Sequence, residues 1–191
     1  MSPTLGIQGG IGSFCEAAAK KYARSCPDKN FEFVYLYNTE TVLDSLAKGA
    51  VDQAIFAYEN STGGLVQETQ TALQKHPVKK ITEIDLPVTH ALMTLPEIQL
   101  TDITQVQAHP QVFAQCQQNL RQIYPHLQQI TGDGKSIDTA YCAQQLNQRK
   151  IIPTTAILGN AALADIYGWQ IVRENIQDRP DNVTTFWAVS K

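Results

Sequence analysis

The sequence predicts an α/β protein of two lobes, with mixed, mostly parallel sheets and a ligand cleft between the lobes. Short apolar runs alternate with longer helical segments along almost the whole chain, as in parallel strands joined by helices. The alternation is interrupted once, near residue 80, and then resumes as a second series. With 191 residues and 43% hydrophobic side chains, the chain is long enough to bury two small cores.

The first series consists of three strands, each followed by a helix. The predicted strands are TLGIQ, FEFVYLY and QAIFAY. Ser13 caps the first helix, and Glu16 three residues later completes the pattern of a capping box. The second helix starts at Thr39 and ends at Gly49, and the third helix spans residues 65–73.

Two extended segments interrupt this alternation between residues 78 and 95. In VKKITEIDLPVTHALMTL, Leu86 precedes Pro87, and the residue before a proline favours an extended backbone. The second series then has the strands TQVQAH, LQQIT and TTAILG and helices over residues 110–121, 136–146 and 160–166. The final segments, WQIVRENI and NVTTFWAVS, are also predicted strands.

This order of elements predicts where the chain passes between the lobes. It crosses near residues 80–90 and returns near residues 175–182. We therefore expect residues 1–85 and 178–191 to form lobe 1 and residues 86–177 to form lobe 2. Two-lobed α/β proteins bind small ligands in the cleft, where strand ends and helix starts converge.

Composition narrows the classes of partner. A net charge of −3 without long runs of like charge argues against nucleic acid or an anionic membrane as a partner. No apolar stretch approaches the roughly 20 residues of a membrane helix, and no export signal is visible, so we expect a cytoplasmic protein. Four scattered cysteines without CxxC spacing favour reduced thiols, and four histidines without ligand spacing argue against a metal site.

Four short sequences place polar groups where a strand meets a helix. The glycines of QGGIGSF let a ligand approach the unpaired amides of a helix start, although a tight turn without a ligand also explains them. YENSTGG places a carboxylate, an amide and hydroxyls after a buried strand, where burying them costs free energy unless they bind a partner. A turn that caps the next helix also explains them. In AHPQ, His109 precedes a helix-starting proline, and SIDTA offers hydroxyls that either bind a ligand or cap a helix.

Taken in order, these blocks resemble those of the prephenate dehydratase family and the related plant-type arogenate dehydratases. The family pattern G-x-x-G-[SAT]-[FY]-[SC]-E-A-A near the start corresponds to GGIGSFCEAAA in this chain. The remaining blocks are ENSTGG, LPVTHAL, AHPQVFAQC, SIDTAYCA and the tail ADIYGWQIVRENIQDRPDN. The resemblance covers about residues 6–189 and implies two lobes like those of periplasmic binding proteins, with the active site between them.

The sequence departs from the family pattern in two respects. Family members usually continue into a regulatory ACT domain, whereas this chain stops after the catalytic region, so we expect no ACT domain. The family signature N-x-T-R-F reads Asn182-Val183-Thr184-Thr185-Phe186 here, with Thr185 in place of arginine. Loss of an arginine that bound a substrate carboxylate would weaken the site, unless Arg179 reaches in or the family arginine points away from the cleft.

The resemblance implies a carbon–oxygen lyase of phenylalanine biosynthesis that acts on prephenate or arogenate without a cofactor. Thr184 would donate a hydrogen bond to the departing oxygen. The residues expected to catalyse are Thr184, Asn60 and Ser61, and those expected to bind substrate are Gly12, Ser13, Glu59, His109, Thr139, Thr185 and Phe186. Family members usually assemble, so we expect a homodimer or homotetramer.

Two alternatives remain open at this stage. The altered T-R-F block also fits a non-aromatising prephenate decarboxylase, although the retained ENS block and Thr184 argue against it. A non-catalytic protein would use the same cleft to hold an aromatic or dicarboxylate ligand. Product analysis distinguishes the three hypotheses.

Overall fold

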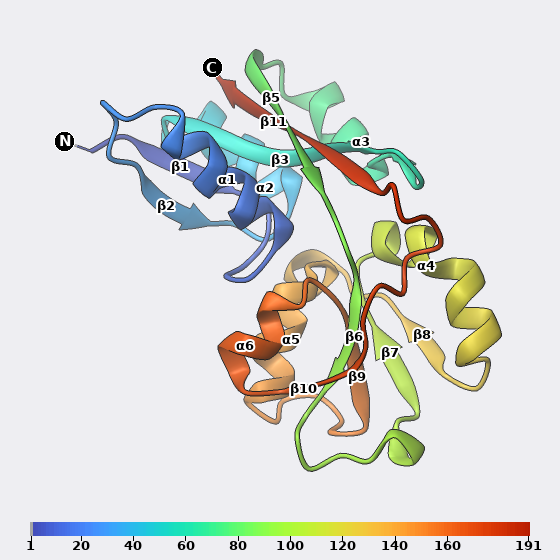
Figure 1. The fold of residues 1–191 in the computed structure, drawn as a ribbon. Helices are drawn as coiled ribbons and strands as arrows, with labels where there is room; N and C mark the ends of the chain where they lie inside the picture. Colours follow the sequence, from blue (N-terminus) through green and yellow to red (C-terminus); the bar gives the residue numbers. More distant parts are fainter. Residues whose placement is uncertain (1) are drawn as a thin grey trace.

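The computed structural model describes residues 2–191 and has two α/β lobes, one above the other in Figure 1. One sheet contains β1–β5 and β11, and we call it, with helices α1–α3, lobe 1. The other sheet contains β6–β10 and forms lobe 2 with α4–α6. The α/β class and the two sheets agree with the sequence-based prediction.

Lobe 1 is a sheet covered by helices on both faces. Its elements are β1 (Thr4–Ile7), α1 (Phe14–Arg24), β2 (Glu32–Tyr35), α2 (Thr39–Ala47), β3 (Gln53–Asn60), β4 (Gly64–Leu65), α3 (Gln67–Lys75), β5 (Lys79–Pro87) and β11 (Val183–Ser190). On one face, Ala18 and Tyr22 of α1 pack with Ile7 and Phe186. On the other face, α2 and α3 cover a separate cluster that includes Phe56.

Lobe 2 repeats this three-layer arrangement. Its elements are β6 (Ala91–Thr94), η1 (Leu100–Asp102), β7 (Gln105–Gln107), α4 (Pro110–Ile123), β8 (Gln128–Ile130), η2 (Gly134–Ile137), α5 (Thr139–Asn147), β9 (Thr155–Gly159), α6 (Ala162–Tyr167) and β10 (Gln170–Arg173). Phe113 and Leu120 of α4 pack on one face. Leu146 of α5 and Leu163 of α6 pack on the other.

Both sheets are mixed, and apart from the short β3–β4 pair every antiparallel pair involves β6 or β11. In lobe 1, β1 pairs in parallel with β2 and β3, whereas β11 runs antiparallel between β3 and β5. In lobe 2, β7 pairs in parallel with β8 and β9, whereas β6 runs antiparallel to β9 and β10. The parallel pairs come from the strand–helix series, and β5, β6, β10 and β11 flank the two crossings.

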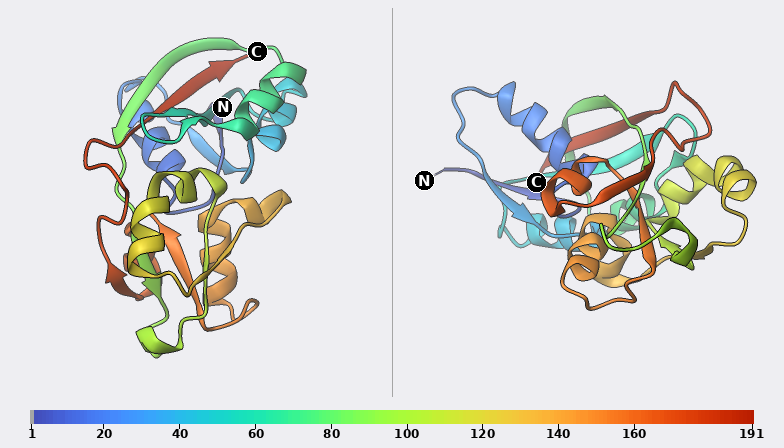
Figure 2. Two further views of the ribbon diagram at one scale, coloured as in Figure 1. Left: turned by 90° about the vertical axis from the view of Figure 1, so that its right-hand side faces the viewer. Right: turned by 60° about the horizontal axis from the view of Figure 1, so that its bottom comes forward.

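The two crossing segments lie side by side and form a hinge between the lobes (Figures 1 and 2). Val88 donates its N–H to the carbonyl of Asn182 (3.0 Å), and Ile176 donates to the carbonyl of His90 (3.0 Å). The extended backbone that Leu86-Pro87 predicted is present, since β5 includes both residues and ends at Pro87. The hydrogen bonds between the crossings limit how the lobes can move relative to each other.

Several predicted element boundaries shift by a few residues. The helix expected from Ser136 begins at Thr139, because Asp138 caps it by accepting the N–H of Tyr141 (2.8 Å). The helix expected from residue 65 begins at Gln67, because Leu65 pairs with β3 as part of β4. Within residues 2–191, no helix has the length and apolar character needed to span a membrane.

The predicted capping box at the start of α1 forms only in part. The hydroxyl of Ser13 accepts the N–H of Glu16 (3.1 Å), as expected. The Glu16 carboxylate accepts the N–H of Gly12 (2.9 Å), the residue before the cap. The carboxylate therefore fixes the glycine turn that precedes the helix.

Candidate active site

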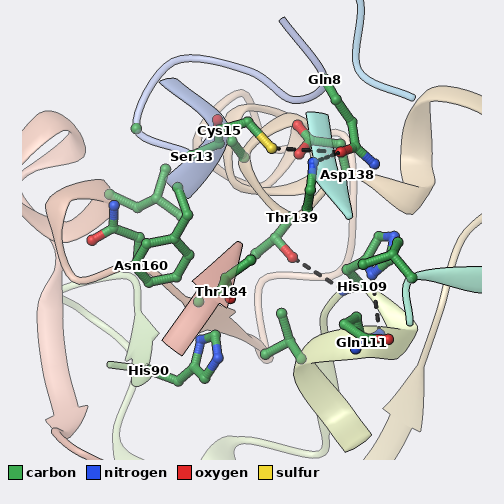
Figure 3. Close-up of a pocket in the computed structure, with 18 of the residues that line it drawn as sticks. Gln8, Ser13, Cys15, His90, His109, Gln111, Asp138, Thr139, Asn160 and Thr184 are labelled. Carbon is green, nitrogen blue, oxygen red and sulfur yellow. Dashed lines mark hydrogen bonds between the residues drawn. The ribbon is translucent and has the colours of Figure 1, made fainter. Parts of the chain in front are cut away.

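A cavity with an empty volume of about 750 Å³, including its mouth, lies between the lobes (Figure 3). The first turns of α1, α4 and α5, the start of β11 and the hinge form its wall. The cavity therefore lies where the sequence analysis expected a ligand cleft.

The predicted site residues fall into two groups. The residues that line the cavity are Gly12, Ser13, His109, Thr139, Thr184 and Phe186. The residues that do not line it are Glu59, Asn60, Ser61 and Thr185. In the second group, Asn60 donates a hydrogen bond to the side chain of Thr184, which lines the cavity. The other three residues make no side-chain contact of this kind.

The Thr184 hydroxyl lies on the cavity wall and is positioned by Asn60, which is fully buried. The carbonyl oxygen of the Asn60 side chain accepts the N–H groups of Thr62 (2.9 Å) and Gly63 (2.7 Å), which fixes the orientation of the amide. The amide nitrogen therefore donates to the Thr184 hydroxyl oxygen (3.0 Å). In this contact the hydroxyl oxygen is the acceptor, so the contact does not use the hydroxyl hydrogen. The Thr184 O–H therefore remains available as a donor.

Two further hydroxyls on the wall have the same arrangement. The Ser13 hydroxyl accepts the N–H of Glu16, and the Thr139 hydroxyl accepts the N–H of His109 (3.0 Å). Neither hydroxyl donates to an acceptor within residues 2–191. Ser13, Thr139 and Thr184 thus present three aliphatic hydroxyl donors to the cavity.

Helix starts give the cavity wall partial positive charge, while its lining within residues 2–191 includes no lysine or arginine and one acidic side chain, Asp138, which caps α5. The first turns of α1, α4 and α5 contribute to the wall, and a helix start carries partial positive charge. The N–H groups of Phe14 and Cys15 donate to no acceptor within the described part of the chain. These amides and the three hydroxyls are suited to bind carboxylate oxygens.

Gly12 permits the close approach of the two lobes beside the cavity. Its φ is +85°, a conformation that residues with a side chain rarely adopt. A Cβ at this position would lie 2.7 Å from a methyl group of Leu163 in lobe 2. The glycine turn is therefore required by backbone conformation and by packing against lobe 2.

Both ring nitrogens of His109 already have protein partners. Its Nδ1 accepts the N–H of Gln111 (3.0 Å), so Nε2 carries the hydrogen and donates it to Glu68 of lobe 1 (3.1 Å). Burial would raise the pKa of Glu68, but hydrogen bonds from His109 and Thr39 outweigh it and lower the pKa. His109 therefore links the lobes and has no free ring nitrogen for a substrate.

Comparisons with known proteins agree with this geometry. The family model described as prephenate dehydratase matches residues 5–191. The chain belongs to this family. It is 33% identical to "Arogenate dehydratase/prephenate dehydratase 1, chloroplastic" of Arabidopsis thaliana, over 98% of this chain and 45% of that protein. The chain thus spans less than half the length of this curated relative.

Solved structures support the family and the fold. A prephenate dehydratase of Arthrobacter aurescens, solved in complex with L-Phe, is 28% identical, with a TM-score of 0.79 over 98% of this chain and 60% of that chain. A periplasmic substrate-binding protein of an ABC transporter from Coxiella burnetii is 14% identical, with a TM-score of 0.53 over 99% of this chain and 84% of that chain. The second likeness concerns the fold alone.

The structure shows where the residue that replaces the family arginine lies. Thr185 follows Thr184 in a strand, where neighbouring side chains point to opposite faces. Its hydroxyl donates to the Asp85 carboxylate (2.6 Å) on the adjacent strand β5, outside the cavity. Arg179 forms an exposed ion pair with Asp181 (2.9 Å) and does not line the cavity either.

The structure does not place Thr185 and Glu59, which were expected to bind substrate, or Ser61, which was expected to catalyse, on the cavity wall. Ser61 accepts the N–H of Val183 (2.9 Å) and ties the β3 turn to β11 outside the cavity. Glu59 has an exposed side chain on the strand opposite Thr185. Glu59 and Asn60 are neighbours in β3 and face opposite sides of the sheet, whereas Ser61 lies in the turn that follows.

Restoring the family arginine is expected to change little. We predict that Thr185→Arg alters kcat/KM by less than about threefold, because the side chain starts outside the cavity beside Asp85. Steady-state kinetics measures the effect, with Thr185→Lys as a control for added positive charge. An increase of tenfold or more that is specific to arginine would show that position 185 reaches the substrate.

Sequence reasoning missed two buried titratable residues that line the cavity, Asp138 and His90. Asp138 accepts the N–H of Gly10 across the lobe boundary (2.9 Å) and caps α5. Burial raises the pKa of the Asp138 carboxyl to about 6, and burial lowers the pKa of His90 to about 4. Both residues stand in recognised blocks, SIDTA and LPVTHAL, which were the available signal.

These two shifts act on stability in opposite directions. Since the Asp138 pKa is raised in the folded state, its contribution to stability declines as the pH rises from about 4 to about 6. Since the His90 pKa is lowered, its contribution declines as the pH falls from about 6.5 to about 4. In the wild-type protein the two contributions largely cancel across this range.

Asp138→Asn should remove one side of this compensation. When the pH is lowered from 7 to 4.5, we expect the free energy of unfolding of the variant to decrease by about 2 kcal/mol more than that of the wild type. Urea denaturation at both pH values measures this difference, with Asp165→Asn on the exposed surface of α6 as control. Equal pH dependence in Asp138→Asn and wild type would contradict the assignment.

Proposed function

We propose that this chain catalyses the decarboxylating dehydration of prephenate, or of arogenate, to phenylpyruvate or phenylalanine. The observation that carries the proposal is the Thr184 hydroxyl, which lines the cavity and keeps its O–H free because Asn60 donates to its oxygen. Family membership supplies the reaction class. The printed names of relatives include both substrates, and the chain spans less than half of those proteins.

The reaction requires a donor at the departing oxygen more than it requires a strong acid or base. As the bond to the ring carboxylate breaks, its electron pair enters the ring and expels the ring hydroxyl, which takes one proton and leaves as water. Carbon dioxide is the second product, and the aromatic ring supplies the driving force. Negative charge develops on the departing oxygen, and an aimed donor in a site with little water lowers this barrier by a few kcal/mol.

Thr184 is suited to this role because its environment determines the direction of its hydrogen. Asn60 belongs to lobe 1 and also donates to Asn182 of the hinge (2.8 Å), so both sides of the amide are held. A hydroxyl that already accepts from such a fixed amide gains most by donating to a substrate oxygen. Thr184 therefore acts as a preorganised donor.

The remaining donors are suited to hold the substrate carboxylates. Ser13 and the free N–H groups of Phe14 and Cys15 form one group at the start of α1. The Thr139 hydroxyl lies at the start of α5 in the other lobe. A substrate with two carboxylates would bridge these groups and hold the lobes closed around the ring.

Product analysis tests the proposal. Purified protein is incubated with prephenate and, in parallel, with arogenate, and products are separated by chromatography against reactions without protein. Phenylpyruvate or phenylalanine above the spontaneous rate is the expected result. A dihydro-hydroxyphenylpyruvate product, or tight binding without turnover, would contradict the proposal and indicate a non-aromatising decarboxylase or a binding protein instead.

Location and assembly are a separate proposal. We propose a cytoplasmic homodimer or homotetramer, supported by the sequence features given above and by the usual assembly of the family. The plant relative carries the word chloroplastic in its name. Sedimentation analysis of the purified chain tests the assembly, and a monomer at all concentrations would contradict it.

A further inference from the structure

His90 lies in the first crossing of the hinge, between the end of β5 and the start of β6, and is 2% exposed. Its backbone N–H donates to the Gln177 side chain (2.9 Å), and its carbonyl accepts from Ile176. Its ring lines the cavity and meets the ring of Phe14 from lobe 1 edge to face, with 5.4 Å between centroids. His90 and Thr184 are therefore parts of the same cavity wall (Figure 3).

A chain of side-chain amides determines which nitrogen of His90 carries the hydrogen. Asn60 donates to the side-chain oxygen of Asn182, so the Asn182 nitrogen must donate to the oxygen of Gln115 (2.7 Å). The Gln115 nitrogen donates to the carbonyl of Gln111 (2.9 Å). The Gln115 oxygen is therefore an acceptor, and His90 donates Nε2–H to it (2.8 Å).

This assignment leaves Nδ1 of His90 as an acceptor without a partner. Nδ1 is buried and has no hydrogen-bond partner within residues 2–191. A buried acceptor that stays unpaired costs free energy. The ring that carries Nδ1 lines the cavity, so a donor on a molecule bound there is the candidate partner for this atom. Since burial lowers the pKa of His90 to about 4, the ring is neutral near pH 7 and Nδ1 keeps its lone pair.

We propose that Nδ1 of His90 accepts the hydrogen of the substrate's ring hydroxyl, so that the oxygen turns its lone pairs toward Thr184. This inference rests on the proposed function and assigns the receptor of the one donor that prephenate and arogenate share at the reacting centre. Ionised carboxylates have no hydrogen to give, so they are directed to the hydroxyls and amides elsewhere on the wall. His90 and Thr184 then bind the same oxygen, one as acceptor and one as donor.

Two substitutions separate this role from a structural role. In His90→Gln, the side-chain nitrogen reaches the position of Nε2 and keeps the donor to Gln115, but the acceptor at the Nδ1 position is lost. In His90→Asn, an oxygen near the Nδ1 position keeps the acceptor and the bond to Gln115 is lost. We expect His90→Gln to keep its melting temperature but to lose about ten- to a hundredfold in kcat/KM with both substrates.

The complementary variant should show the opposite combination. We expect His90→Asn to melt at a lower temperature than His90→Gln, yet to retain more kcat at temperatures where it is folded. A purely structural role predicts the reverse order of activities. Full kcat/KM in His90→Gln, or a loss confined to arogenate, would overturn the proposal, the latter because it would assign Nδ1 to the amino group.

A binding measurement keeps the test independent of turnover. The probes are two saturated-ring dicarboxylate analogues of prephenate, one with the ring hydroxyl and one without it, measured by calorimetry. We expect the wild type to prefer the hydroxyl analogue by roughly tenfold, and His90→Gln to lose that preference. If the preference exists without turnover, only the proposed function fails; if the wild type has no preference, the role of His90 is wrong.

Discussion

Replacing Thr184 with valine is expected to lower kcat by about a hundred- to a thousandfold with little loss of stability. Valine has nearly the shape of threonine and suits a strand, so the start of β11 keeps its packing. The hydroxyl oxygen that accepts from Asn60 disappears, but Asn60 still donates to Asn182 and to the Val183 carbonyl (3.1 Å). Steady-state kinetics and thermal melting, measured on the same preparation, give both values.

The matched control for this substitution is Thr184→Ser. Serine restores the hydroxyl without the methyl group, so its kcat should recover to within about tenfold of the wild type. The KM of the valine variant should change much less than kcat, because the carboxylates are held elsewhere. If Thr184→Val kept wild-type kcat, another group would have to protonate or stabilise the departing oxygen.

The second large effect is expected from Asn60→Asp. The new carboxyl keeps the oxygen that accepts from Thr62 and Gly63, but it loses the nitrogen that donates to Thr184. The Thr184 hydroxyl would then turn and donate to the carboxylate, and its hydrogen would no longer point into the cavity. We expect kcat to fall by about a hundredfold and stability by about 3 kcal/mol, because the carboxylate is buried without a counter-charge.

Ser61→Ala is the control for Asn60→Asp because the two residues are adjacent in the same turn. Ser61 contacts β11 outside the cavity, so the variant should keep kcat within about threefold of the wild type. Comparison of the two variants at a temperature where both are folded separates catalysis from stability. A larger loss in Ser61→Ala than in Asn60→Asp would show that the orientation of Thr184 depends on the turn as a whole.

Much of the fold was predictable because its signals are local. Alternation of apolar runs and helical segments predicted the strand–helix series, and Leu86-Pro87 predicted an extended crossing. The short β4 and the start of α5 were missed, because they depend on pairing with β3 and on capping by Asp138. Such tertiary contacts leave no periodic pattern in the sequence.

The cavity was predictable in outline and less so in its chemistry. Ser13, Thr139 and Thr184, which the blocks singled out, lie on its wall. Strand alternation alone should have excluded Thr185 once Thr184 was assigned to the cleft. The state of His90 was out of reach, because its tautomer follows from a chain of amides that converge only in the fold.

The most direct measurement of the central claim compares two leaving groups. Thr184 is proposed to assist the departure of hydroxide, so its importance should fall when the leaving group needs no proton. For prephenate, we expect the ratio of the wild-type kcat to the Thr184→Val kcat to be about a hundred or more. For a prephenate analogue with fluoride in place of the ring hydroxyl, we expect this ratio to be at least about tenfold smaller. An equal ratio for both substrates would contradict the account, because Thr184 would then serve some step other than departure of the oxygen.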